Sequence, residues 1–333
     1  KVVWESLVTQ AGARVLLHGF VQDAIVENRQ VKELIVATKA GLQRVAASVV
    51  IDASGDADVC HHAGLGYELA GDLAPAQTLT TTFRMTNVDT TRRATIGKGE
   101  LHRLMDEAVT AGSFDLPRRE GSDHITPIDD MTATIMTRVE QVERLGDRLI
   151  NATDPDVLTR VEIEGRRQAL EYVNFLIDRV PGYEHASLVA LSTQIGLRET
   201  RRVYGDYRVT RDDVLAARQF DDQIGLCGAP IEDHHGGAGT GTTWEYLPQG
   251  SAVGIPLRSL IVRDADNVLV AGRCFSATHD AQASIRSMAQ CMAMGEAAGS
   301  LAGFAVRHGG NVRAVSSQTV REELGRSGAI LEL

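Results

Sequence analysis

The sequence predicts an α/β protein in which both ends of the chain build one domain and the middle forms a second, inserted domain. Two short apolar runs, 49–51 and 268–271, are typical of strands buried in a parallel sheet, and each leads into a turn and a helical pattern. The chain between them has a different sequence pattern, with threonine-rich strand patterns and long helical ones. We therefore expect residues 1–72 and 253–333 to form the first domain and residues 73–252 the inserted one.

The first segment predicts a helix followed by a meander of strands. Residues 1–11 have helical character and stop at a glycine, which commonly ends a helix. Apolar residues then alternate through 21–26 and 31–36, and residues 28–30 between them are a turn signal. A third strand pattern completes a three-stranded meander, which leads into the buried strand at 49–51.

The middle segment mixes helices with strands. Residues 78–88 are a threonine-rich strand pattern, and residues 99–112 and 156–180 have helical periodicity. Pro155 suits the first turn of the second helix, because its fixed φ is helical and its missing N–H leaves nothing unpaired. Residues 188–210 predict further strands, so we expect a mixed α+β inserted domain.

The last segment predicts short strands and one long helix. Strand patterns cover 255–262 and 268–271, and Gly272 permits a tight exit turn or the close approach of a ligand. A helical pattern runs from about Ser284, the expected N-cap, to Arg307. Its many alanines and glycines would let the helix lie close to a sheet or a cofactor; the alternative is an ordinary packing face.

The motif VVIDASGDADV (49–59) places a turn of small residues after a buried strand. Ala53, Ser54 and Gly55 would let a phosphate or ribose approach the backbone, and a helix can begin at Asp56. The N-terminus of such a helix offers free N–H groups and a partial positive charge. The same pattern also occurs as a simple strand-to-helix turn, so both interpretations stay open on this motif alone.

The composition narrows the function classes. The chain of 333 residues has a net charge of −10, which argues against nucleic acid as its main partner. No run approaches the roughly 18 apolar residues of a membrane span and no signal segment is visible, so we expect a cytoplasmic protein without a membrane span. The four cysteines form no C-x-x-C pair and are expected to be reduced thiols. A small-molecule substrate suits these properties.

Four stretches carry a resemblance to a known family. They are IEGRRQALEYVNFL (163–176), VPGYEHASL (180–188), IGLRETRRVYGDYRVTRDDVL (195–215) and VLVAGRCFSATHDAQASIRSMAQCMAMGEAAGSLAG (268–303). Together with the meander and the two motifs, they resemble the bacterial FAD-dependent oxidoreductases of the glutathione-reductase-like superfamily, which are distantly related to fumarate-reductase flavoproteins. The resemblance covers nearly the whole chain.

The resemblance implies a three-layer FAD-binding domain with an inserted substrate domain. It also implies a set of cofactor-binding residues, with Ser54 standing where threonine is usual, a change that keeps the hydroxyl. The implied contacts are Val21 beside the adenine, Ala53, Ser54 and Gly55 along the AMP half, Gly272 and Arg273 at the pyrophosphate and ribityl chain, and Ser284, Ile285 and Arg286 at the flavin ring.

One family feature is not found in the sequence. The first strand and its G-x-G-x-x-G turn, which bind the pyrophosphate in such folds, have no counterpart here, so we expect an FAD-binding domain that is incomplete at its N-terminus. The glycine-dense stretch HHGGAGTGTTWEY (234–246) follows no apolar strand. We interpret residues 234–243 as a mobile loop, for which a lid over the substrate site is one role.

His279 and Arg198 are the candidate catalytic residues. His279 is expected in the loop before the flavin-facing helix, where it could exchange a proton near neutral pH, or else stabilise the loop with a hydrogen bond. Strand alternation would point Arg198 and Thr200 to one side, where Arg198 reaches a substrate oxygen or the flavin; an ion-paired strand is the alternative. We expect no metal site at residues 233–235, because three adjacent residues rarely converge on one ion.

The resemblance leads to one main function and one alternative. The main prediction is an FAD-dependent oxidoreductase that transfers a hydride between a small organic substrate and the flavin. The alternative is a non-catalytic fragment or subunit that cannot hold FAD without a missing N-terminal segment. A partner subunit or a second copy of the chain could supply that segment, because open sheet edges invite pairing.

Overall fold

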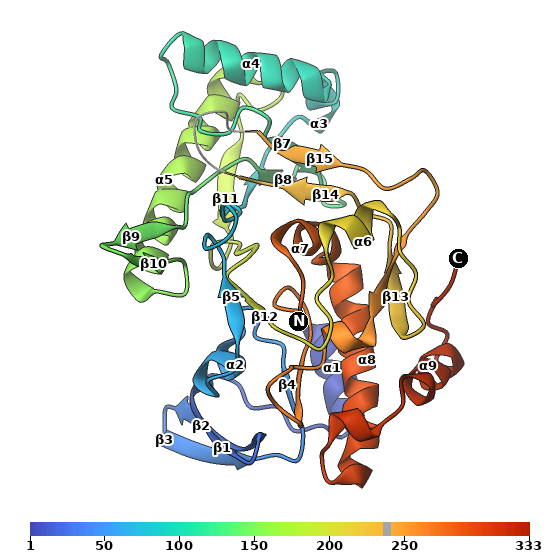
Figure 1. The fold of residues 1–333 in the computed structure, drawn as a ribbon. Helices are drawn as coiled ribbons and strands as arrows, with labels where there is room; N and C mark the ends of the chain where they lie inside the picture. Colours follow the sequence, from blue (N-terminus) through green and yellow to red (C-terminus); the bar gives the residue numbers. More distant parts are fainter. Residues whose placement is uncertain (236–240) are drawn as a thin grey trace.

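A helix and a three-stranded meander open the chain, as the sequence predicts. The computed structural model describes residues 1–235 and 241–333 and has a mixed α/β fold (Figure 1). Asn28 and Arg29 link the first two strands with φ of 48° and 62°, the geometry of a tight hairpin turn. The first elements are α1 (Val2–Gln10), β1 (Phe20–Glu27), β2 (Gln30–Thr38) and β3 (Gly41–Ala46), and the strands pair in the order β1-β2-β3.

The two predicted buried strands lie side by side. β4 (Val50–Asp52) and β17 (Val268–Val270) pair in parallel, with Val50 opposite Val268, which confirms the parallel pairing. The strand β17 is fully buried. Because parallel strands end at the same edge, the turns that follow β4 and β17 meet there.

The helix after β4 begins later than predicted. Helix α2 (Asp58–His62) starts two residues beyond Asp56, because Ala57 has a positive φ of 54° and cannot belong to the helix. The delay leaves residues 53–57 as an extended turn at the edge of the β4–β17 pair.

The middle segment is built around a four-stranded antiparallel sheet. Its strand order is β11 (Ser187–Leu191), β6 (Phe83–Thr86), β8 (Thr132–Ile135) and β7 (Ser122–Ile125). The predicted helices are α4 (Lys98–Thr110) and α5 (Pro155–Arg179), which lie at the top of Figure 1. Asp154 caps α5, since its carboxylate accepts from the N–H groups of Asp156 and Val157.

The remaining elements are short. Four two-stranded sheets pair β5 with β12, β9 with β10, β13 with β16 and β14 with β15. Their bounds, with those of the helices, are β5 (Tyr67–Leu69), α3 (Thr90–Arg93), β9 (Glu143–Leu145), β10 (Arg148–Ile150), β12 (Arg201–Val203), α6 (Arg211–Leu215), β13 (Gln223–Cys227), β14 (Ile231–Asp233), β15 (Thr243–Glu245), β16 (Val253–Pro256), α9 (Ser317–Arg326) and 3₁₀ turns at Leu257–Ser259, Val306–His308 and Val312–Ala314.

The single long helix expected at the C-terminal end is two helices. α7 (His279–Ile285) ends at Arg286, and α8 (Met288–Ala305) begins after Ser287, whose extended backbone (ψ 158°) separates them. The predicted N-cap Ser284 is therefore wrong. Its side chain is buried inside α7 and donates to the Ala229 carbonyl at 2.7 Å, so Ser287 takes the N-cap position instead.

The buried apolar residues form separate clusters. The largest joins the meander, the β4–β17 pair and α8 to residues 203–231 and 253–262. A second cluster fills the space between α4, α5 and the four-stranded sheet. A third, smaller one lies under the start of α5. The predicted division of the chain at residues 73 and 252 stays a prediction.

Candidate functional site

The turns after β4 and β17 come together although they are far apart in the sequence. Gly55 is buried with φ +80°, and a Cβ added to it would lie 2.5 Å from Nη1 of Arg273. Ala271 donates its N–H to the Asp52 carbonyl at 3.1 Å. The structure thus places the predicted residues Ala53, Ser54 and Gly55 next to Gly272 and Arg273.

Asp52 fixes the shape of the turn after β4. One of its carboxylate oxygens accepts from the Ser54 N–H (3.1 Å) and hydroxyl (2.7 Å), and the other accepts from the Cys60 N–H at 3.0 Å. The Ser54 oxygen also accepts from the Asp58 N–H at 2.9 Å. The hydroxyl that was expected at the AMP half therefore has a structural role, and Asp52 is the residue that the sequence prediction missed.

Arg273 has hydrogen-bonding capacity left over. Its Nη2 donates to Asp56 at 2.8 Å, and the same carboxylate oxygen accepts from the Thr200 hydroxyl at 2.6 Å. The Nε of Arg273 is buried and makes no hydrogen bond with any residue that the structure describes. Gly272 has φ +93°, and the nearest described atom to a Cβ added there is Cys291 Sγ at 4.0 Å. The turn after β17 thus combines open space with an unused donor.

The other predicted cofactor residues belong to β1 and to the end of α7. Val21 is half-buried on β1 and packs against the largest core cluster. The side chains of Ser284 and Ile285 are buried within α7. Arg286 is half-buried, and its Nη2 donates to Gln77 Oε1 at 2.9 Å. Among Ser284, Ile285 and Arg286, only Arg286 has a partly accessible side chain.

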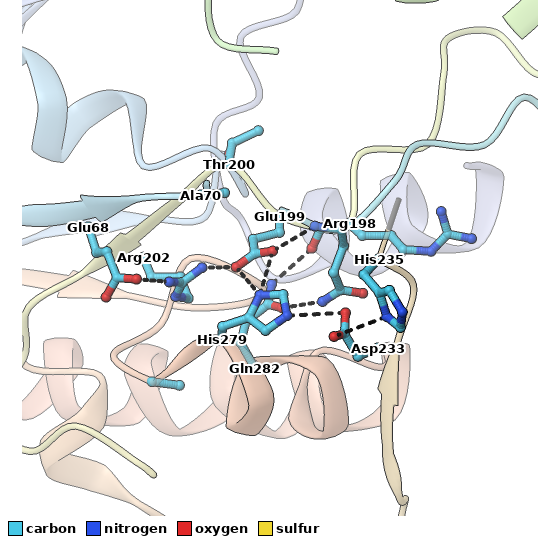
Figure 2. A network of polar contacts seen from close by, with 12 residues as sticks. Glu68, Ala70, Arg198, Glu199, Thr200, Arg202, Asp233, His235, His279 and Gln282 are labelled. Carbon is cyan, nitrogen blue, oxygen red and sulfur yellow. Dashed lines mark hydrogen bonds and ion pairs between the residues drawn. The ribbon is translucent and has the colours of Figure 1, made fainter. Parts of the chain in front are cut away.

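His279 lies between two carboxylates (Figure 2). It is the first residue of α7, not a loop residue as predicted, and is 5% exposed. Its Nδ1 is 3.0 Å from both carboxylate oxygens of Glu199, and its Nε2 is 3.1 Å from Asp233 Oδ1. Asp233 Oδ2 in turn lies 3.6 Å from Nδ1 of the more accessible His235. Burial alone would raise the pKa of Asp233, but its interactions with the neighbouring histidines, His279 first among them, outweigh burial and lower that pKa.

Glu199 continues the network in the other direction. It accepts from the Gln77 N–H at 3.1 Å and contacts Arg202, which also contacts Glu68. Arg202 is 1% exposed, and burial lowers its pKa to about 10. A continuous line of ionisable groups therefore runs from Glu68 through the interior to Asp233.

The structure corrects the expected geometry around Arg198. β12 begins only at Arg201, so strand alternation does not govern residues 198–200. Arg198 donates from Nη1 to the Thr78 carbonyl at 2.6 Å, whereas Thr200 reaches Asp56. Burial lowers the pKa of Arg198 to about 9, and the charge of Arg286 adds to that shift.

Residues 233–235 do not share one ligand site. His234 Nε2 lies 2.9 Å from Glu232, and burial lowers the pKa of His234 to about 4, so this ring is neutral near pH 7. Across residues 1–235 and 241–333, no group of three His, Cys, Asp or Glu is placed to hold a metal ion. Residues 236–240, the centre of the predicted lid at 234–243, lie outside the described residues.

A family comparison identifies the class of protein to which the chain belongs. Residues 1–324 match the family of FAD dependent oxidoreductases. The chain belongs to the FAD-dependent oxidoreductase family. FAD, predicted from the sequence, is therefore confirmed as the cofactor of this family of enzymes.

Several solved flavoenzyme structures are similar to this FAD-dependent oxidoreductase over nearly its whole length. The flavin-dependent brominase Bmp2 (12% identity, TM-score 0.43) is covered over 58% of its chain, and 98% of this chain is covered. A geranylgeranyl bacteriochlorophyll reductase-like protein from Thermoplasma acidophilum is 14% identical, with a TM-score of 0.43. The match covers 57% of that protein and 97% of this chain. The myxobacterial chondrochloren halogenase CndH is 12% identical, with a TM-score of 0.43, and the match covers 55% of CndH and 98% of this chain. The chain thus spans a little over half the length of these proteins, and a comparison with curated proteins gives no match.

The described part of this chain has two further properties that bear on the predictions. None of its helices is both long and apolar enough to traverse a lipid bilayer. The four cysteines are free thiols, three of them buried. Burial raises the pKa of the Cys60 thiol well above its ordinary value, so Cys60 is a poor nucleophile.

The residues at the β4–β17 edge fit FAD. Phosphate oxygens are strong acceptors, and the buried Nε of Arg273 is a charged donor that lacks an acceptor among the described residues. A Cβ added to the adjacent Gly272 would have no described atom nearer than Cys291 Sγ at 4.0 Å, its chain neighbours aside. An unused cationic donor next to a glycine turn is the chemistry expected for a bound pyrophosphate.

Proposed function

We propose that this FAD-dependent oxidoreductase transfers a hydride between a small organic substrate and its flavin. The meeting of the two turns after β4 and β17, with Gly272 open and Arg273 carrying an unused donor, is the observation that carries the proposal. Family membership supplies the cofactor. FAD, when bound, supplies the acceptor or donor of the hydride.

The residues that would hold FAD follow the two turns. Gly272 and Arg273 would bind the pyrophosphate and ribityl chain. Contacts with the remainder would come from Val21 at the adenine, Ala53, Ser54 and Gly55 at the AMP half, and Ser284, Ile285 and Arg286 at the flavin ring. Because Ser284 and Ile285 have buried side chains, their contribution would come from the backbone and from the position of Arg286.

The polar network of Figure 2 would hold and transfer a proton beside the substrate. His279 can hold a proton at Nδ1 toward Glu199 or at Nε2 toward Asp233, because a carboxylate faces each nitrogen. His235, the more accessible end of the line, would connect this proton with solvent. Arg198 would orient an oxygen of the substrate.

The first experiment is the visible absorption spectrum of the purified chain after mixing with FAD and desalting. We expect flavin bands to remain, because the arginine donor and the open glycine turn are already in place. A colourless protein would contradict binding by this chain alone. Adding FAD without desalting serves as the control for free cofactor.

Replacing His279 by glutamine is expected to lower turnover at least about tenfold, since general acid–base groups contribute about 10²–10⁴-fold. The FAD content should stay near that of the parent. Glutamine can donate from its amide nitrogen to a facing carboxylate but cannot carry the proton, so the rate should fall while FAD stays bound. The matched control is the exposed His308→Gln, which should behave like the parent.

A loss of FAD that equals the loss of rate in His279→Gln would make His279 a positioning residue. Unchanged turnover at full FAD content would remove it from the proton path altogether.

Exposed apolar surface favours a second candidate function, a chain that holds FAD only together with a further segment or subunit. All nine residues of α1 are exposed, including Val2, Trp4 and Leu7. On α8, Gly295 and Gly299 are exposed and have open space beside them. A partner subunit or a second copy of the chain would cover these surfaces. FAD retention that appears only in a dimer, as measured by size-exclusion chromatography with light scattering, would favour this candidate.

A further inference from the structure

Four arginines gather where the middle segment meets α7. Arg118 precedes β7, Arg138 follows β8, Arg198 precedes β12 and Arg286 follows α7. They come from four separate stretches of the chain, and a connected set of polar contacts joins their surroundings.

The first pair shares one carboxylate. Arg138 contacts Glu120 through Nη2, and Arg118 Nε lies 3.5 Å from the same carboxylate oxygen. Their side chains are only 4% and 10% exposed. Arg118 Nε and Arg138 Nη1 nevertheless make no hydrogen bond with any described residue. Buried donors of this kind are normally satisfied, so the pair lacks an acceptor.

The contacts continue to the second pair. Arg138 Nη2 lies 3.4 Å from the Thr242 hydroxyl, which is 3.1 Å from His234 Nδ1. The His234 carbonyl accepts from the N–H and hydroxyl of Thr78, and the Thr78 carbonyl accepts from Arg198. The neighbouring Gln77 accepts from Arg286. Arg198 and Arg286 therefore border residues 77–78, and Arg138 is linked to the same residues through Thr242 and His234.

Positive charge is in excess among these residues. The carboxylates whose charges act on these arginines are Glu120, Glu232 and Asp233, so four guanidinium groups meet three carboxylates, and His234 is neutral near pH 7. Within the described part of the chain, neither Arg198 nor Arg286 has a carboxylate within 4.0 Å, and Arg286 Nε is another buried donor without a partner. Burial lowers the pKa of these two arginines to about 9 and about 10, which leaves both cationic at neutral pH.

We propose that Arg118, Arg138, Arg198 and Arg286 bind the anionic group of the substrate, and that the substrate is a small organic carboxylate. The planar guanidinium fork matches the two oxygens of a carboxylate, which would accept from the unused donors and offset the excess positive charge. This inference rests on the proposed function, because it places the substrate next to Arg286, one of the residues expected at the flavin ring.

The test is calorimetric titration of the purified chain at low ionic strength with succinate, with uncharged succinamide as the matched ligand control. We expect succinate to bind and succinamide not to bind. Arg138→Gln and Arg198→Gln should each weaken succinate binding at least about tenfold, since a hydrogen bond to a charged group is lost in each. Arg198→Lys, which keeps the charge without the fork, should bind with intermediate affinity.

Arg92→Gln is the matched protein control, because Arg92 is an exposed arginine paired with Glu184 and should bind succinate like the parent. Circular dichroism checks that each variant is folded. Absence of succinate binding, equal binding in the parent and both glutamine variants, or tighter binding of inorganic phosphate than of succinate would each overturn the proposal.

FAD retention measured on the same samples separates the two proposals. Flavin bands without succinate binding would overturn the carboxylate site and leave the proposed oxidoreductase function in place. Arginine-dependent succinate binding in a protein that retains no FAD would support the anion site and contradict cofactor binding by this chain.

Discussion

Replacing Arg202 by methionine is expected to lower the free energy of unfolding by about 3–5 kcal/mol, because it leaves buried carboxylates without their counter-charge. Arg202 contacts Glu68 and Glu199, whose side chains are 2% and 0% exposed. Glu68 keeps a contact with Arg208, and Glu199 keeps His279. Urea unfolding followed by circular dichroism measures the loss without screening the charges as a salt denaturant would.

A surface arginine with the same kind of partners provides the control. Arg103 also contacts two glutamates, Glu100 and Glu107, but its side chain is 53% exposed. Solvent screens that cluster, so Arg103→Met should unfold at nearly the parent urea midpoint.

A rescue variant tests the cause. Combining Arg202→Met with Glu68→Gln and Glu199→Gln removes the uncompensated charges and should recover much of the lost stability. If Arg202→Met alone is as stable as the parent, the buried carboxylates do not depend on Arg202. If the triple variant is no better than the single one, the loss comes from packing and not from charge.

Replacing Gly272 by valine is expected to reduce FAD per chain to less than a tenth of the parent value. Valine would enter the open space beside Arg273 that we assign to the cofactor, at a position whose φ of +93° already disfavours side chains. The absorbance ratio of flavin to protein after desalting measures the change.

Backbone strain must be separated from crowding of the cofactor. Gly328 has φ +89° and no described neighbour within 4 Å of an added Cβ, so Gly328→Val introduces similar strain outside the two turns. It should keep its FAD. Equal losses in both variants would mean that strain alone explains the effect, and full retention in Gly272→Val would remove Gly272 from the cofactor site.

The sequence predicts those parts of the fold that local chemistry decides. Asn28 and Arg29 form the expected turn, and Asp154 with Pro155 begins α5 as expected, because capping groups and hairpin turns involve residues close in sequence. The strands β4 and β17 are also predicted, because a short apolar run between turn signals is typical of a strand in the interior of a sheet.

Long-range pairing decides the parts that the sequence does not predict. The charged cluster around Arg198 is visible in the sequence. The partners are not, because Arg202 contacts Glu68 across 134 positions and His279 contacts Glu199 across 80 positions. No local pattern predicts such partners. Asp52 carried a weak local signal, because an aspartate two residues before a serine at a strand end is a common turn former.

The choice between two serines shows the same limit. Ser284 and Ser287 are equally good helix caps by composition, and the sequence favoured the wrong one. The Ala229 carbonyl, which is distant in sequence, accepts the Ser284 hydroxyl and holds it inside α7. A tertiary contact therefore fixed a local boundary.

The parallel pair has a consequence for how the protein is made. Asp56 and Arg273, which join the two turns, are 217 positions apart. During synthesis their ion pair therefore cannot form until Arg273 has been added to the chain. At roughly 5–20 residues per second, the wait lasts about ten to forty seconds. During that time β4 has no parallel neighbour, whereas the middle segment can already close its own core between α4, α5 and the four-stranded sheet. We expect the cofactor site to be the last part of the nascent chain to form.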